Sequence, residues 1–244
     1  MSMPSAALPT AAMLVIGDEI LSGRTRDANT HFLAGELTQH GIELKEVRVV
    51  SDDAGAIVAG VRALSLQYDT VFTSGGIGPT HDDITADCIA AAFDLQIDVR
   101  ADARALLAAH YEKSGTELNE ARLRMARIPE GALLIDNPVS VAPGFIVRNV
   151  HVMAGVPSVF QAMVASVLPG LTGGEPIKSQ SMPILLGEGD IAGPLCQLAD
   201  AFADLSIGSY PFQKDGIYGA NIVIRGPDEA RISAAMTRLR ELFE

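Results

Sequence analysis

The chain has 244 residues and a mass of 25.7 kDa, which suits one large domain or one domain with a smaller companion. Hydrophobic residues make up 48% of the chain and charged residues 20%, so disorder is excluded as the dominant state. Acidic residues outnumber basic ones by 30 to 18, and the net charge of −12 opposes binding to phosphate backbones and anionic membranes. We therefore expect no nucleic-acid or membrane partner. Any anionic ligand must be held by backbone amides, a metal ion or a few arginines.

Two further features point to the cytoplasm. Cys88 and Cys196 lie far apart without the spacing of a metal site, which suits a reducing compartment. The first twelve residues lack the basic start and long apolar core of a signal peptide, and no run of 18 apolar residues occurs. We expect a cytoplasmic protein in which residues 1–10 are a disordered start.

Strand and helix patterns alternate along residues 11–170. Apolar runs predict strands over 13–17, 44–50 and 70–73, and each is followed by a helix, over 27–40, 52–64 and 84–93. Residues 102–127 are expected to be helical with a break near Gly115. Short strands follow at 133–135, 145–147 and 151–153, and a helix at 159–168 closes the domain. This order predicts an α/β domain with three layers, in which a parallel sheet carries helices on both faces.

The order of predicted strands and helices changes after a segment rich in glycine and proline, and we expect residues 171–180 to be a linker. Residues 181–244 follow as a small α+β domain of the KH-like βαββα type. Its strands are predicted at 184–186, 206–210 and 221–225, and its helices at 191–202 and 229–242. Gly216–Gly219 matches the GxxG string of RNA-binding KH modules. That string falls between two strands, however, and this region has five bases against nine acids, so RNA binding is not expected.

The segment Thr73–Thr85, TSGGIGPTHDDIT, is the richest in chemical signals. Its glycines follow a buried strand and precede a helix, where backbone N–H groups can form a cradle for a phosphate. The residues of this cradle are Gly75, Gly76, Gly78, Pro79 and Thr80. The segment is neither a P-loop nor a dinucleotide fingerprint, because Pro79–Thr80 and His81 stand where those motifs need other residues. A glycine-rich turn with capping aspartates is the structural alternative.

Acidic residues follow each of the first three strands. Asp82 and Asp83 adjoin the cradle, Asp18 follows the first strand, and Asp52 follows the second. Loops at the carboxyl ends of parallel strands converge on the ligand crevice of an open α/β sheet. Carboxylates beside a phosphate repel it unless a divalent cation lies between them, so we expect Mg²⁺, with Mn²⁺ or Co²⁺ as alternatives. Acids at helix N-termini are also favourable without any ligand.

A third segment, Asp136–Gly144, and the related Gly155–Pro157 form rigid loops with backbone donors and an Asn amide. Such loops suit a flat heteroaromatic ligand, and they are equally ordinary turn chemistry.

Together these motifs resemble a known family. GDEILSG, Asp27-Ala28-Asn29, TSGGIGPTHDDIT, NPVSVAPG and GVP, in that order, are similar to the molybdopterin-binding (MoaB/Mog-like) domain over about residues 11–170. Within this family, the motifs resemble most those of the CinA N-terminal domain and the matching domain of eukaryotic FAD synthases. Ile207–Pro211 also looks like the small KH-like domain of FAD synthases. The chain departs from the family pattern at Ala28, Ser140 and Ala154.

The resemblance implies a homo-oligomer that binds a small-molecule nucleotide or pterin. Similarity to CinA-like members implies metal-dependent hydrolysis of the pyrophosphate bond in ADP-ribose or FAD. The GDEIL and GPTHDDIT motifs favour this function. Mog-like members imply molybdopterin binding and adenylylation, and a non-catalytic nucleotide sensor is a third alternative. The CinA amidase and FAD synthase adenylyltransferase activities are not expected. The implied residues are Asp82, Asp83 and Asp18 as catalytic groups; Gly75, Gly76, Gly78, Pro79, Thr80, Asn29, Asn137 and Gly144 for the substrate; and Asp18, Asp52 and Asp83 for the metal.

Overall fold

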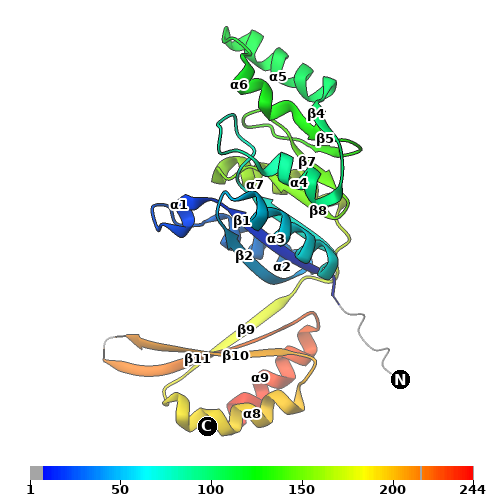
Figure 1. Ribbon diagram of the computed structural model, residues 1–244. Coiled ribbons are helices and arrows are strands. Elements are labelled where there is room, and N and C mark those ends of the chain that lie inside the picture. Colours follow the sequence, from blue (N-terminus) through cyan, green and yellow to red (C-terminus); the bar gives the residue numbers. More distant parts are fainter. Residues whose placement is uncertain (1–7, 215, 244) are drawn as a thin grey trace. The chain divides into compact units, whose positions relative to one another are not determined.

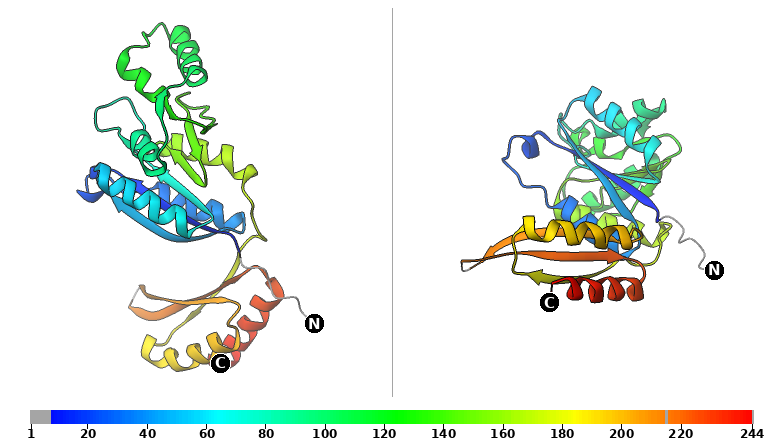
Figure 2. Two further views of the ribbon diagram at one scale, coloured as in Figure 1. Left: turned by 45° about the vertical axis from the view of Figure 1, so that its right-hand side comes forward. Right: turned by 90° about the horizontal axis from the view of Figure 1, so that it is seen from below.

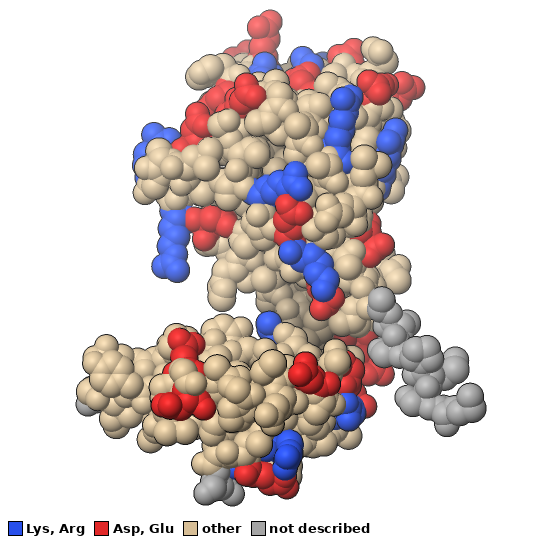
Figure 3. Space-filling view, turned by 60° about the horizontal axis from the view of Figure 1, so that its bottom comes forward, with Lys and Arg blue, Asp and Glu red and all other residues tan. Residues whose placement is uncertain are grey.

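The computed structural model describes residues 8–214 and 216–243 (Figure 1). The chain divides into two compact units between Gly174 and Glu175, within the segment expected to be a linker. Of the predicted disordered start, residues 1–7 lie outside the described part, and Thr10 is already the first residue of a strand. None of the described helices combines the length and the apolar character that a membrane crossing needs. Acidic and basic side chains are interspersed on the face drawn in Figure 3.

The first unit is built on a six-stranded sheet with the order β2-β1-β3-β8-β7-β6. These strands are β1 (Thr10–Ile16), β2 (Glu43–Val50), β3 (Thr70–Ser74), β6 (Leu133–Ile135), β7 (Gly144–Val147) and β8 (Val150–Met153). The pairings among β2, β1, β3 and β8 are parallel, as expected, whereas β7 and β6 run antiparallel to their neighbours. The sequence did not predict this reversal. It follows from the two-residue connection between β7 and β8, which is too short for a parallel crossover.

Helices cover both faces of this sheet (Figure 2). Along β1, Ala12, Leu14 and Ile16 pack into one core with α3 (Ala54–Gln67) and α4 (Thr85–Phe93). The alternate residues Ala11, Met13 and Val15 pack into a second core with α2 (Asn29–Gln39) and α7 (Pro157–Val167). All six side chains are at most 3% exposed. The apolar run that predicted this strand therefore serves two cores, and the three-layer α/β fold is confirmed.

An insertion separates α4 from β6. It contains β4 (Ile97–Val99), α5 (Ala101–Ser114), α6 (Glu120–Leu123), the 3-10 turn η1 (Arg124–Ala126) and β5 (Arg127–Pro129). The expected break is present, because α5 ends at Gly115 with a φ of 65°. β4 and β5 pair with each other and were missed by the sequence, because three residues are too few to establish an alternating pattern. The first unit also contains α1 (Asp18–Leu21) and the 3-10 turn η2 (Leu168–Gly170).

The second unit has the predicted βαββα order. Its elements are β9 (Lys178–Ile184), α8 (Glu188–Ala201), β10 (Ser206–Lys214), β11 (Ile217–Gly226) and α9 (Glu229–Phe243). The sheet is antiparallel with the order β10-β11-β9, and both helices contribute to its single core. The strand expected over 184–186 is wrong. The strand ends at Ile184, and its first three residues belong to the expected linker, because pairing with β11 selects the polar segment 178–181. Gly216–Gly219 lies in the turn of the β10–β11 hairpin and at the start of β11.

The two cysteines should differ sharply in reactivity. Cys88 on α4 is 4% exposed, and burial, with smaller contributions from the Asp87 and Asp53 carboxylates, raises the pKa of its thiol to about 11. Cys196 on α8 is exposed. Because thiolates are the reactive species, iodoacetamide at about pH 8 should modify only Cys196 in the native protein and both cysteines after denaturation. Peptide mass spectrometry checks this, and native labelling of Cys88 would contradict the burial.

Candidate functional site

A cleft of about 750 Å³ opens at the carboxyl ends of β1, β3 and β8. Its walls come from the loops after β1, β2, β3 and β8, together with Met125 and the loop 137–142. The sequence predicted from strand order alone that the loops after the first three strands converge. A contact between Asp18 and Asp52 is one example. The Asp18 N–H donates a hydrogen bond of 2.9 Å to Asp52 Oδ2, which joins the loops after β1 and β2.

The backbone of the glycine loop, residues 75–78, admits no side chain at its first two positions. Gly75 has a φ of 112°, and an added Cβ would lie 2.2 Å from the Ile16 carbonyl oxygen. Gly76 has a φ of 69°, and its Cβ would lie 2.1 Å from Thr85 Oγ1. Thr85, the first residue of α4, donates its Oγ1–H to the Gly75 oxygen (3.0 Å) and its N–H to the Gly76 oxygen (2.9 Å). Helix α4 therefore begins directly against the glycine loop.

Three N–H groups of this loop are available to a ligand. The Gly75 N–H donates to the Met153 oxygen at 3.1 Å, so it is already used. Among the described residues, no hydrogen bond occupies the N–H groups of Gly76, Ile77 and Gly78, and all three residues line the cleft. Consecutive free N–H groups before a helix N-terminus attract anions. Of the predicted cradle residues, Gly76 and Gly78 therefore have a free N–H beside the cleft, Ile77 is an addition, and their contact with a phosphate stays a prediction.

Pro79 and Thr80, predicted to touch the substrate, do not line the cleft. Thr80 instead braces Asp83, because its N–H and Oγ1–H both donate to Asp83 Oδ2, at 2.8 and 2.5 Å. This arrangement fixes the carboxylate against the loop. A Cβ on Gly78 would lie only 2.6 Å from that same oxygen.

Four carboxylates line the cleft, those of Glu19, Asp52, Asp82 and Asp83. None of the described lining residues is lysine, arginine or histidine. The side chain of Asp18 is exposed and does not line the cleft, so the acid contributed by the loop after β1 is its neighbour Glu19. Sequence reasoning passed over Glu19, although it stands in the same Gly-Asp-Glu motif.

This donor set fits a divalent cation that is shared with a ligand. Among the described residues, no three acidic, histidine or cysteine side chains are gathered as a ready-made metal cage. The ligand set Asp18, Asp52 and Asp83 accordingly stays a prediction. Mg²⁺ is commonly held by one or two carboxylates plus the phosphate oxygens of a substrate, and the carboxylate-lined cleft beside the free amides suits that mode.

Asn29 lies behind the cleft and ties its loops together. The side chain is 4% exposed, and Nδ2 donates to Ser74 Oγ and to the Gly155 oxygen, both at 2.8 Å. Its Oδ1 is buried, with no partner among the described residues. Asn29 does not line the cleft and holds its loops in place, while its predicted substrate contact stays a prediction.

Asn137 and Gly144 help to fix the backbone around the cleft. Asn137 lines the cleft, but its Nδ2 donates to Ser140 Oγ and the Ala142 oxygen, and its Oδ1 accepts from two N–H groups of the same loop. It therefore shapes the loop 137–142. Gly144, expected to touch the substrate, is the buried first residue of β7 and lies outside the lining; its added Cβ would lie 2.4 Å from the Val152 oxygen.

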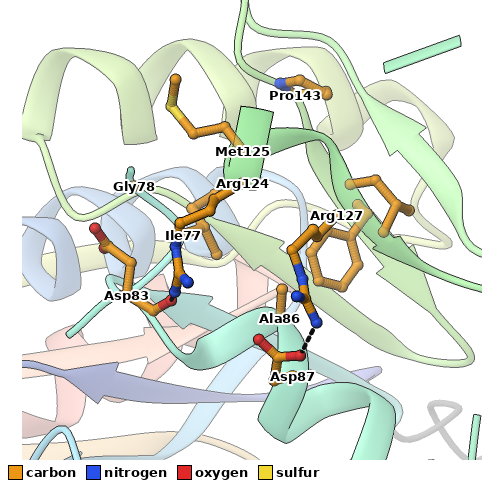
Figure 4. A pocket seen from close by; sticks show the side chains of 12 residues that line it. Ile77, Gly78, Asp83, Ala86, Asp87, Arg124, Met125, Arg127 and Pro143 are labelled. Atoms are coloured by element: carbon orange, nitrogen blue, oxygen red, sulfur yellow. Dashed lines mark hydrogen bonds and ion pairs between the residues drawn. The ribbon is translucent and has the colours of Figure 1, made fainter. Parts of the chain in front are cut away.

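Two arginines that the sequence did not single out adjoin the glycine loop (Figure 4). Arg124 Nη2 donates to the Asp83 backbone oxygen at 3.2 Å, and Arg127 forms an ion pair with Asp87. Both come from the insertion, about 40 positions after their partners. No local motif connects residues that far apart, so the sequence held no signal for them.

Comparison with known proteins identifies the family of the first unit. Residues 12–173 match the model described as "Probable molybdopterin binding domain". The chain belongs to this family. Residues 176–244 match the family described as "FAD synthase, middle domain", so both units of this molybdopterin-binding-domain protein have relatives.

Individual relatives agree with this assignment. A probable FAD synthase from Caenorhabditis elegans is 35% identical over an alignment of 258 positions, which covers 96% of this chain and 50% of that protein. A protein from Archaeoglobus fulgidus is 33% identical, and the match covers 95% of this chain and 96% of that protein. The crystal structure of CinA from Thermoplasma acidophilum is similar with a TM-score of 0.61 and 34% identity, over 66% of this chain and 96% of that one. The chain spans about half the length of the FAD synthase.

Proposed function

We propose that this CinA-like chain is a metal-dependent hydrolase that cleaves the pyrophosphate bond of ADP-ribose, FAD or a related dinucleotide. The observation that carries the proposal is the juxtaposition of three free N–H groups, in Gly76–Gly78, with four carboxylates in one cleft. The amides suit a phosphate, and the carboxylates suit a cation that neutralises it. The similarity to a probable FAD synthase supports a nucleotide as the ligand.

The cleft also offers separate places for the two parts of a dinucleotide. Its phosphate end is the glycine loop, and the loops 137–142 and 154–159 add apolar surface from residues such as Val139, Val156 and Val159. Val139 and Val156 are 53% and 59% exposed, so a flat ring could cover them. A volume of about 750 Å³ lies in the range of ordinary small-molecule sites.

In the proposed reaction, the oxygen of a water molecule bonds to one phosphorus, and the bond from that phosphorus to the bridging oxygen breaks. ADP-ribose would yield AMP and ribose 5-phosphate. Asp83, which Thr80 holds beside the loop, would accept the proton of the water, and the N–H groups of residues 76–78 would stabilise the developing negative charge. Glu19, Asp52 and Asp82 are the carboxylates available to a divalent cation, which would lower the pKa of a bound water and offset phosphate charge.

The test is hydrolysis of ADP-ribose and FAD with Mg²⁺, Mn²⁺ or Co²⁺, followed by chromatography of AMP. Loss of a positioned proton acceptor should lower kcat by about 100-fold or more in Asp83→Asn. Asp94→Asn is the matched control, because Asp94 is exposed at the far end of α4 in a left-handed conformation that asparagine tolerates. Absence of turnover by the wild type, or full turnover by Asp83→Asn, would sink the proposal.

Molybdopterin binding is the second candidate, and the description of the matched family favours it. The same cradle and apolar loops would hold a pterin with its phosphate. Tight binding of molybdopterin by a protein that cleaves neither dinucleotide would favour this function over hydrolysis.

A further inference from the structure

One arginine beside the cleft has no anionic partner in the part of the chain that the structure describes. Arg124 forms no ion pair with any described residue, whereas Arg127, three positions later, is paired with Asp87. Its Nε is buried without a hydrogen-bond partner among the described residues, and its only hydrogen bond there is the 3.2 Å contact from Nη2 to the Asp83 backbone oxygen. A buried guanidinium N–H without a partner is costly, and an anion beside the side chain would offset that cost.

Arg124 lies beside the glycine loop. A small void of about 10 Å³ is lined by Arg124 together with Gly76, Ile77 and Gly78, the three residues with free N–H groups (Figure 4). The same three residues line the main cleft, and so do Asp83 and Met125, the residue after Arg124. The guanidinium therefore adjoins the proposed phosphate cradle, whereas the cleft lining itself has four carboxylates and no basic side chain among its described residues.

We propose that Arg124 pairs with the phosphate charge of the ligand and selects for diphosphates. The inference rests on the proposed function for the identity of the ligand. A monophosphate needs only one counter-charge, whereas two adjacent phosphates can use a cation on the carboxylate side and Arg124 on the insertion side. Arginine suits this role because its planar fork forms two parallel hydrogen bonds with phosphate oxygens.

A purely structural role is the competing explanation. In that case Arg124 only clamps the 80–83 loop through the Asp83 backbone oxygen, and the charge of the side chain does not matter. Arg124→Gln keeps a donor but removes the charge, and Arg124→Lys keeps the charge. These variants separate the two explanations. Arg122→Gln is the matched control, because Arg122 lies two positions away, stacks over Tyr111 and donates to the Glu117 oxygen.

The experiment is calorimetric titration of the full chain with imidodiphosphate, ADP-ribose and adenosine in buffer containing Mg²⁺. Loss of a charge-assisted contact should weaken imidodiphosphate and ADP-ribose binding by about tenfold or more in Arg124→Gln, and by less in Arg124→Lys. Adenosine affinity should not change, and Arg122→Gln should match the wild type. Added guanidinium, at a concentration that leaves the melting temperature unchanged, should partly restore the affinity of an Arg124→Ala variant.

The outcomes separate this inference from the proposed function. Unchanged imidodiphosphate affinity in Arg124→Gln, or no imidodiphosphate binding by the wild type, overturns the role of Arg124 even if the protein hydrolyses ADP-ribose. Equal losses in Arg124→Gln and Arg124→Lys, with lower melting temperatures in both, support the clamp and overturn the charge. If the wild type cleaves neither dinucleotide, but Arg124→Gln still loses imidodiphosphate affinity, the inference stands and the proposed hydrolysis fails.

Discussion

Replacing Asn29 with aspartate should destabilise the protein by about 3–5 kcal/mol near neutral pH, the usual effect of a buried, uncompensated charge. The change substitutes an acceptor for the Nδ2 group that donates to Ser74 Oγ and the Gly155 oxygen. Ser74 can turn its hydroxyl toward a carboxylate, but the Gly155 carbonyl oxygen cannot donate. Urea denaturation of both proteins measures the difference in unfolding free energy.

This loss should depend on pH in a definite direction. Burial disfavours the charged form, so the folded-state pKa of the new carboxyl rises above its unfolded value of about 4. The folded variant then holds its proton over a pH range in which the unfolded chain has lost it. Stability relative to the wild type should therefore be highest below about pH 4 and fall as the pH rises to the folded-state pKa.

Asn119→Asp is the control for this change. Asn119 is exposed and caps α6 by accepting the Arg122 N–H, a place where aspartate serves equally well. Its effect should stay within about 0.5 kcal/mol. A pH-independent loss in Asn29→Asp, or equal losses in both variants, would show that Asn29 is not the buried clamp described above.

Gly75→Ala should destabilise the protein by at least about 2 kcal/mol and abolish nucleotide cleavage. A positive φ costs a non-glycine residue about 1–2 kcal/mol, and here the new methyl group would also lie 2.2 Å from the Ile16 carbonyl oxygen. Ile16 is the last residue of β1, so its oxygen cannot move without disturbing the sheet. Chemical denaturation and the hydrolysis assay measure the two effects.

Gly131→Ala separates conformational strain from steric overlap. Gly131 has a φ of 76°, and an added Cβ there meets nothing within 4 Å. This variant should therefore lose about 1 kcal/mol and keep full activity. If Gly75→Ala is no less stable than Gly131→Ala, the close approach of the glycine loop to β1 is not rigid.

The sequence predicted structure best where a local pattern has one usual structural role, such as an apolar run in a buried strand or an aspartate at a helix N-terminus. The apolar run 13–17 predicted a buried strand, which the structure places at Thr10–Ile16. Asp53, in the segment expected to open a helix, caps α3 by accepting the Ala56 N–H. The antiparallel edge of the sheet, β4, β5 and the start of β9 were not predictable, because tertiary pairing decides them. Lys178–Ile184 is largely polar and becomes a strand through its register with β11.

The sequence predicted which loops form the cleft better than it predicted which side chains line it. Strand order brought the loops containing Asp52 and Asp83 to one cleft, as the sequence indicated. Which of Asp18 and Glu19 lines the cleft depends on the short helix α1, whose turn leaves Asp18 exposed. The role of Arg124 depends on the path of the insertion, which no spacing in the sequence specifies. Sequence motifs therefore indicate where a site lies, whereas the local backbone conformation decides which side chains line it.

The parallel pairing of β3 with β8 has a consequence for folding. Val71 lies opposite Val150, so the neighbour of β3 is synthesised about 80 positions after it. The glycine loop is completed only then, when the Gly75 N–H meets the Met153 oxygen. Contacts of such long range form slowly, and a nascent chain that ends before β8 leaves β3 with an open edge. The glycine loop is therefore among the last parts of this unit to take shape on the ribosome, although its motif leaves the exit tunnel early.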